Sequence, residues 1–202
     1  MKERIVKGAE DLFLSYGVKI ITMDEIARNL GISKKTIYQY YKDKNELVCE
    51  VINNHLKERE KSYRQIADIA VDPIHELIKL TEYVRDSFRN INPIILFEVE
   101  RYFPKAFQNW VDHKEKCLKV YIIDILNRGK EQGLFRMEIN VEMLSRLRIE
   151  EIQLGFNIAV FPPMQFSIQE LQIQFIDYFL HGICTLKGHK LINKYKNIQD
   201  DD

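Results

Sequence analysis

The chain has 202 residues, of which 46% are hydrophobic and 30% charged, so it is long enough to bury a sizeable core. Thirty basic and thirty acidic residues cancel to a formal net charge of zero, so a nucleic-acid site has to rest on locally concentrated charge. Cys49, Cys117 and Cys184 lie far apart, which excludes a disulfide framework or a CxxC zinc cluster and fits a reducing cytoplasm. No signal peptide or apolar run of membrane-spanning length is found, so we expect a cytoplasmic protein with no membrane partner.

The first predicted helix covers residues 2–16. Its apolar residues recur at intervals of three and four, and Gly17 stands where a helix C-cap is expected. We expect this helix to pack across the segment that follows it and to hold that segment rigid.

The next segment reads as two short helices joined by a tight turn. Thr22 and Glu25 have the spacing of a capping box at the start of the first helix. Gly31 follows the last apolar residue of that helix, and Ser33 can cap a second helix over residues 34–41. Two such helices can cross closely only if the contact point carries a small residue on the first helix, a glycine at the turn and a branched apolar residue on the second helix.

The contact point meets this requirement with Ala27 on the first helix, Gly31 at the turn and Ile37 on the second helix. These are the steric demands of a helix-turn-helix, whose second helix enters the DNA major groove. Between Arg28 and Lys44 there are five Lys or Arg residues and one acid, a local net charge of +4. The alternative is an ordinary helical hairpin with a solvated basic face.

This stretch resembles the N-terminal DNA-binding domain of the TetR/AcrR family of bacterial transcription regulators. The similarity covers roughly residues 5–48, with Lys35 where the family often has Gly or Ala and Tyr41 where Phe is usual. The matching residues are Ala9, Leu12, Phe13, Tyr16, Gly17, Thr22, Ile26, Ala27, Gly31, Ile32, Ser33, Thr36, Ile37, Tyr38, Tyr40, Tyr41, Lys44, Glu46 and Leu47.

The expected fold is all-α with about nine helices. An N-terminal three-helix helix-turn-helix DNA-binding domain over residues 1–47 would precede a larger helical ligand-binding and dimerisation domain over residues 48–202. The remaining predicted helices cover 44–66, 73–88, 94–102, 104–132, 141–161 and 168–186. The sequence after Gly188 is polar, so we expect a frayed tail there.

The predicted DNA-binding residues belong to the capped turn and its second helix. Ser33, Lys34 and Lys44 are expected to contact phosphates, which position the protein on the duplex. Thr22 completes the set, and the candidates for base-edge contacts are Lys35, Thr36, Tyr38, Gln39 and Tyr40. Gln suits adenine and Lys suits guanine.

The middle of the chain is rich in aromatic residues. The family resemblance implies an inducer pocket in this region, and we expect its ligand to be largely apolar or aromatic. Core packing is the alternative for each residue. The candidates are Tyr83, Phe88, Phe97, Phe107, Trp110 and Tyr121.

The last two predicted long helices carry more apolar surface than one core face needs. The resemblance implies a homodimer, in which two helices from each subunit form a four-helix bundle. Gly155 and Ala159, one turn apart on a helix, would allow close approach. The predicted interface residues are Ile152, Gly155, Phe156, Ala159, Leu171, Phe175 and Phe179.

These features predict a ligand-responsive repressor that binds a double-stranded palindromic operator as a homodimer and is released by a small effector. No catalytic constellation or phosphate loop is found, so we expect neither an enzyme nor a cofactor. A metal or redox sensor built on His181, Cys184 and His189 is an alternative, but the position of Cys184 in an apolar stripe favours packing, and no metal is expected. The other alternative is a DNA-binding protein that binds no small ligand.

Overall fold

The computed structural model describes residues 1–197. Within these residues the secondary structure is helical, apart from an isolated bridge between Phe135 and Cys184. The helices are α1 (Lys2–Tyr16), α2 (Met23–Leu30), α3 (Lys34–Tyr38), α4 (Lys44–Ile69), α5 (Pro73–Ser87), α6 (Ile94–Tyr102), α7 (Pro104–His113), the π-helical turn η1 (Lys114–Leu118), α8 (Lys119–Glu131), α9 (Val141–Leu154), α10 (Ile168–Ile183) and α11 (Leu186–Lys196). The all-α prediction is confirmed. None of the described helices is long and apolar enough to cross a membrane.

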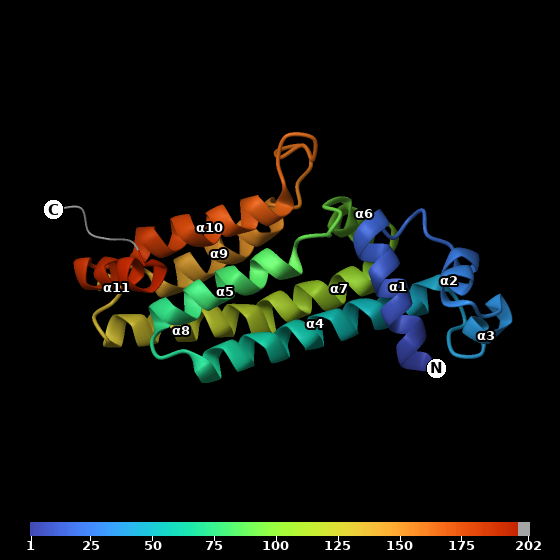
Figure 1. Ribbon diagram of the computed structural model, residues 1–202, viewed down its shortest axis with the longest axis horizontal. Coiled ribbons are helices and arrows are strands. Elements are labelled where there is room, and N and C mark those ends of the chain that lie inside the picture. The colour runs from blue at the N-terminus through green and yellow to red at the C-terminus, as the bar shows by residue number, and fades with distance from the viewer. Residues whose placement is uncertain (198–202) are drawn as a thin grey trace.

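The molecule is elongated, with α1–α3 gathered at one end (Figure 1). The long helix α4 runs from this head into the body, where it packs along α7. In the body α5 packs along α10, α8 lies against α9, and α11 closes the far end (Figure 1). The head is therefore carried on one continuous helix.

Two apolar clusters make up the core of the described residues. The first begins in α1–α4 and continues through Val84, Phe88, Val99 and Ile176 of the body. The second fills the far end of the body between α4, α5 and α8–α11. The head and body thus share one packed cluster, and the division at residue 47, which falls within α4, stays a prediction.

Side-chain caps fix several of the predicted helix starts. The Asp43 carboxylate accepts from the Glu46 N–H at 2.8 Å at the start of α4. Asp72 accepts from the His75 N–H at 2.9 Å, and Pro73 occupies the first turn of α5. These local signals are the reason that the starts of α4 and α5 could be predicted.

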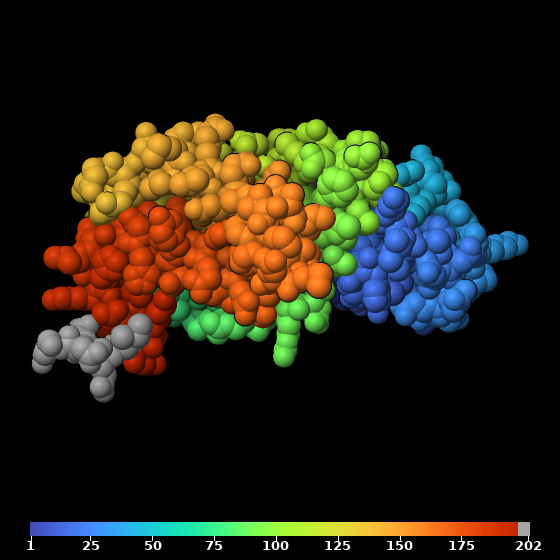
Figure 2. Space-filling view, turned by 90° about the horizontal axis from the view of Figure 1, so that it is seen from above, coloured from blue at the N-terminus to red at the C-terminus, as the bar shows by residue number. Residues whose placement is uncertain are grey.

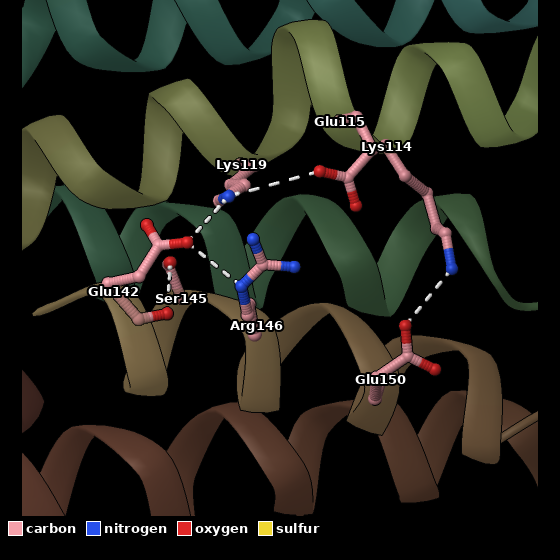
Figure 3. Close-up of polar contacts among 7 residues, drawn as sticks. All are labelled: Lys114, Glu115, Lys119, Glu142, Ser145, Arg146 and Glu150. Atoms are coloured by element: carbon pink, nitrogen blue, oxygen red, sulfur yellow. Dashed lines mark hydrogen bonds and ion pairs between the residues drawn. The ribbon is translucent and has the colours of Figure 1, made fainter.

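Ion pairs fasten α9 to the helix formed by η1 and α8 (Figure 3). The Lys114 ammonium pairs with Glu150 at 3.1 Å, and the Lys119 ammonium pairs with Glu142 at 2.8 Å. Glu142 also accepts from Arg146 at 2.8 Å on its own helix. The helix predicted over 104–132 forms as α7, η1 and α8, which follow one another without a break.

The C-terminal third departs from the prediction in two places. The helix expected over 141–161 ends at Leu154, because Gly155 and the side chain of Asn157 start turns that lead to Pro162 and Pro163. Gly155 and Ala159 therefore do not lie one turn apart on a helix. The prediction of a frayed tail after Gly188 is also wrong as far as Lys196, because Thr185 caps α11 and Ile192 is buried in the second cluster. The rest of the predicted tail, residues 198–202, lies outside the described residues.

Candidate nucleic-acid interface and effector cavity

The turn between α2 and α3 has the geometry that the sequence predicts. The Thr22 hydroxyl accepts from the Glu25 N–H at 3.2 Å, and the Glu25 carboxylate accepts from the Thr22 N–H at 2.6 Å. Gly31 has φ 63°, a left-handed conformation that favours glycine, and the Ser33 hydroxyl accepts from the Thr36 N–H at 3.1 Å. Two caps and one glycine thus hold the helix-turn-helix.

The second helix separates its side chains into two sets. Ile37 is fully buried and Tyr41 is 2% exposed, so both pack into the head. Tyr38 and Tyr40 are 45% and 43% exposed on the outer surface. Since α3 ends at Tyr38, the predicted contact residues Gln39 and Tyr40 lie on the turn that follows it.

The predicted DNA-binding side chains differ in what they already contact. The Lys34 ammonium pairs with Asp24 at 2.6 Å, and the Thr36 hydroxyl lies 2.8 Å from the Ser33 hydroxyl. Within residues 1–197 a second set makes no side-chain hydrogen bond or ion pair. This set, which we call the reading set, is Lys35, Tyr38, Gln39 and Tyr40.

Lys44 is held more tightly than a surface phosphate contact requires. Its ammonium donates to the carbonyl oxygens of Val18 at 2.5 Å and Lys19 at 3.1 Å, and it lies 5.6 Å from the centre of the Phe103 ring. Burial lowers its pKa from the ordinary value. Lys44 therefore ties the α1–α2 loop to α4, and its phosphate contact stays a prediction for the remaining N–H.

Two neighbouring cavities lie where α4 enters the body. The first, of about 60 Å³, is lined by Arg59, Tyr63, Leu77, Leu80, Val84, Phe88, Leu118, Tyr121, Ile122, Ile125, Leu126, Arg148, Ile152, Gln172, Ile176 and Phe179. The second, of about 100 Å³, is lined by Glu10, Phe13, Leu14, Val51, Ile52, His55, Leu56, Arg59, Phe88, Ile91, Ile95, Leu96, Val99, Trp110, Ile152 and Phe156. Arg59, Phe88 and Ile152 line both cavities and so form the partition between them.

The structure distributes the predicted ligand-binding aromatics over several environments. Phe88 lines both cavities, Tyr121 the first and Trp110 the second. Tyr83 and Phe107 pack against the core clusters without lining either cavity. Phe97 is exposed in an outer groove beside Ile158 and Ala159.

The first cavity also carries polar groups that are buried with few partners. Arg148 is 7% exposed, and the Glu151 carboxylate, 3.3 Å away, is its ion-pair partner. Burial raises the pKa of Glu151 despite this neighbour, which marks a poorly solvated pair. The amide of Gln172, which also lines this cavity, donates to the Ile152 carbonyl at 2.8 Å.

A polar chain connects the cavity partition to the head. The Arg59 Nε–H donates to His55 Nε2 at 2.9 Å, and His55 Nδ1 lies 2.7 Å from a carboxylate oxygen of Glu10 on α1. Because Nε2 accepts, Nδ1 carries the proton and donates to Glu10. The Arg59 guanidinium lies 4.5 Å from the centre of the Phe88 ring. The sequence alone does not reveal these contacts, because residues 10, 55 and 88 meet only in the fold.

The predicted dimer residues are divided between the inside and the outside of the subunit. Phe179 is buried in the core, Ile152 lines both cavities, and Phe156 packs against Phe88 with ring centres 6.0 Å apart. Gly155 is buried against Gln172. The outer surface instead carries Ala159 on the 155–166 loop and, only partly buried, Leu171 and Phe175 of α10.

These features define a DNA-binding protein of the helix-turn-helix class with a helical regulatory body. Residues 5–51 match the family described as "Bacterial regulatory proteins, tetR family". The chain is 25% identical over 195 residues to the HTH-type transcriptional repressor KstR2 of Mycolicibacterium smegmatis, covering 94% of this chain and 93% of that protein. The match of the head and the similarity along the chain support a TetR-family transcription regulator.

Solved structures share this fold along most of the chain. A TetR-family regulator from Agrobacterium tumefaciens superposes with a TM-score of 0.76 at 16% identity, covering 91% of this chain and 97% of that one. FadR from Bacillus subtilis, solved in complex with stearoyl-CoA, superposes with a TM-score of 0.67 at 14% identity, covering 91% and 100%. These similarities extend the family fold beyond the head to the body.

Proposed function

We propose that this regulator is a repressor that binds a palindromic operator as a homodimer and leaves it when an effector enters the body. The observation that carries the proposal is the reading set, whose four side chains are exposed and unpaired in the described structure. They lie on α3 and the turn that follows it, in a helix-turn-helix held by two caps, so little ordering is needed before they meet base edges. Two such heads about 34–36 Å apart would enter successive major grooves of one DNA face.

The outer faces of α9 and α10 are the proposed dimer surface. The two helices lie side by side over one broad face of the body (Figure 2). Leu147 and Leu154 of α9 and Tyr178 of α10 are exposed, and Leu171 and Phe175 of α10 are partly buried. An apolar stripe on two adjacent helices matches the self-complementary half of a four-helix bundle.

The cavities favour an effector with an apolar body and an acidic group. Their walls are aliphatic and aromatic, but two guanidiniums, of Arg59 and Arg148, line the first cavity. A carboxylate or phosphate would meet Arg148 more fully than Glu151 does at 3.3 Å. The related FadR structure holds stearoyl-CoA, which combines an acyl chain with acidic groups.

Effector entry would act on the head through the partition. Each cavity is smaller than the roughly 300–1,000 Å³ of a ligand pocket, so a larger effector has to displace Arg59 and Phe88 and merge the two cavities. Displacing Arg59 removes the hydrogen bond that orients His55 toward Glu10 on α1. The effector then favours a second position of the head by its differential affinity for the two states.

Paired acids and alcohols test this proposal. Thermal unfolding and release from an operator duplex are measured with medium-chain and aromatic carboxylates and with their alcohols at fixed salt. We expect stabilisation and release by acids in the wild type but not in Arg148→Met. Arg146→Met on the exposed face of α9 is the matched control and keeps the response. Equal responses to acids and alcohols, or an unchanged response in Arg148→Met, would contradict the proposed effector class.

A further inference from the structure

Three metal-ligating side chains from two separate helices meet on the side of the body where α4 packs on α7. They are Glu60 of α4, His113 at the end of α7 and Cys117 of η1. One ligand atom from each residue lies within 4.8 Å of the other two, and all three residues are partly buried. The sequence predicts no metal site, because these three residues come together only in the fold.

The local backbone explains why His113 and Cys117 face α4 together. They are four residues apart where the α-helix widens into the π-helical turn η1. Such single π turns occur frequently at functional sites. On the other side of the same turn, Lys114 pairs with Glu150 of α9 (Figure 3). Lys114 is thus directed at α9, whereas His113 and Cys117 lie beside α4.

The donor set has the chemistry of a zinc-class site. A thiolate, an imidazole nitrogen and a carboxylate oxygen are the three ligand types that Zn²⁺ takes in proteins. Tetrahedral bonds of roughly 2.0–2.3 Å separate donor atoms by roughly 3.3–3.8 Å. In the structure the three donor atoms lie within 4.8 Å of one another, so they have to approach by at most about 1.5 Å to reach these separations. Three protein ligands leave a fourth position for water or another molecule.

The three side chains are also available for a metal. Within residues 1–197, the side chains of His113 and Cys117 make no hydrogen bond or ion pair, and the His113 ring stacks near Trp110 with ring centres 6.4 Å apart. Glu60 pairs with Arg64, whose side chain is 75% exposed and can return to water. Little existing structure therefore has to be broken when an ion binds.

We propose that Glu60, His113 and Cys117 bind one divalent zinc-class ion that joins α4 to α7 and η1. The ion would clamp the helix that carries the DNA-reading head. It would also fix His113 next to Trp110, a wall of the second cavity. The metal site goes beyond the proposed function, and only its effect on operator binding rests on that function.

Cobalt binding tests the site directly. The full chain, reduced and stripped of metal with a chelator, is titrated with Co²⁺ alone and then with Zn²⁺ alone. We expect one Co²⁺ per chain with a thiolate-to-cobalt charge-transfer band, and displacement of cobalt by zinc. Cys117→Ser removes the band, whereas Cys49→Ser, a partly buried cysteine elsewhere, keeps it. His113→Gln and Glu60→Gln each weaken zinc binding by more than about tenfold.

Thermal unfolding supplies a second readout that needs neither DNA nor effector. Zinc raises the unfolding midpoint of the wild type and of Cys49→Ser, but not of Cys117→Ser or His113→Gln. Circular dichroism confirms that each variant is folded, and His113→Gln replaces Cys117→Ser if the latter does not fold. A folded wild type without the charge-transfer band, or a band that survives in Cys117→Ser, would overturn the site. Because no operator is present, either result leaves the repressor proposal standing.

Discussion

The backbone N–H of Lys19 donates a hydrogen bond of 2.8 Å to the carboxylate of Glu98. Lys19 lies in the loop between α1 and α2, and Glu98 is a buried residue of α6. The Lys19 ammonium also donates to the Tyr102 hydroxyl at 3.1 Å, one turn further along α6. The loop that positions the helix-turn-helix is therefore attached to the body at α6 as well as through α4.

Gly17 is the residue that permits this attachment. Its φ of 90° and ψ of 164° are essentially confined to glycine, and a Cβ would lie 2.7 Å from a carboxylate oxygen of Glu98. We expect Gly17→Ala to cost about 1–3 kcal/mol of unfolding free energy and to displace Glu98. Gly31→Ala is the control, because its Cβ meets no atom within 4 Å. Urea unfolding that finds Gly17→Ala no less stable than Gly31→Ala would refute this.

Tyr38→Ala should weaken operator binding without destabilising the fold. The Tyr38 side chain is exposed and makes no hydrogen bond or ion pair within the described residues, so its removal leaves the head intact. We expect about a tenfold or greater loss of affinity, which corresponds to one base-edge contact. Lys44→Ala should weaken binding and also lower stability, because its ammonium bonds two loop carbonyls. Normal affinity of Tyr38→Ala at fixed salt would remove Tyr38 from the reading set.

Tyr41→Phe should make the head at least as stable as it is now. The Tyr41 hydroxyl is buried without a hydrogen-bond partner, and burial raises its pKa to about 12. Because removing the hydroxyl also removes its desolvation penalty, we expect a gain of up to about 1–3 kcal/mol in chemical unfolding. A loss of more than about 1 kcal/mol would indicate a partner for the hydroxyl.

His55 should make stability fall as the solution becomes acidic. Burial, the largest effect, lowers its pKa below the ordinary 6.5, although the Glu10 carboxylate acts in the other direction. In the unfolded chain the imidazole takes up a proton below about pH 6.5, whereas in the folded chain it does so only at lower pH. The unfolded state then binds more protons, so the free energy of unfolding falls as pH drops below 6.5.

The matched comparison is His55→Gln against His181→Gln. The first should lose less stability than the wild type between about pH 7 and pH 5, measured in metal-free buffer. His181 is more exposed than His55, so its replacement should leave most of the pH dependence in place. Parallel pH profiles of the wild type and His55→Gln would show that His55 is not the responsible group.

A charge on the proposed dimer surface should separate the subunits. Tyr178 of α10 is 78% exposed on this surface, so Tyr178→Glu would place two like charges near each other in a symmetric dimer. We expect sedimentation to show a monomer with unchanged helix content. Val120→Glu on α8 is the control for adding a charge to an exposed apolar residue. Dimers in both variants would move the interface away from α9 and α10.

The head could be predicted because its caps and its turn glycine act on neighbouring residues. Contacts between distant residues determine the body and could not be predicted. Thr22, Gly31 and Ser33 act on their immediate neighbours, so their pattern can be interpreted without a fold. Glu98 could not be assigned, because its partner Lys19 lies 79 positions away. Apolar periodicity identified α10 but could not tell Phe179, which packs inside the subunit, from the outward Tyr178. The ligand cluster on α4 and η1 depends in addition on a π turn, which has no sequence signature of its own.

The proposed role of the helix-turn-helix formed by α2 and α3 is to read a palindromic DNA sequence. The most direct test is selection from random duplex DNA by the purified chain, with the complex sized to obtain its stoichiometry. We expect an enriched palindrome bound by one or two dimers, with no enrichment by Tyr38→Ala under the same salt. A folded wild-type dimer, confirmed free of bound small molecules, that enriches no sequence would contradict this role.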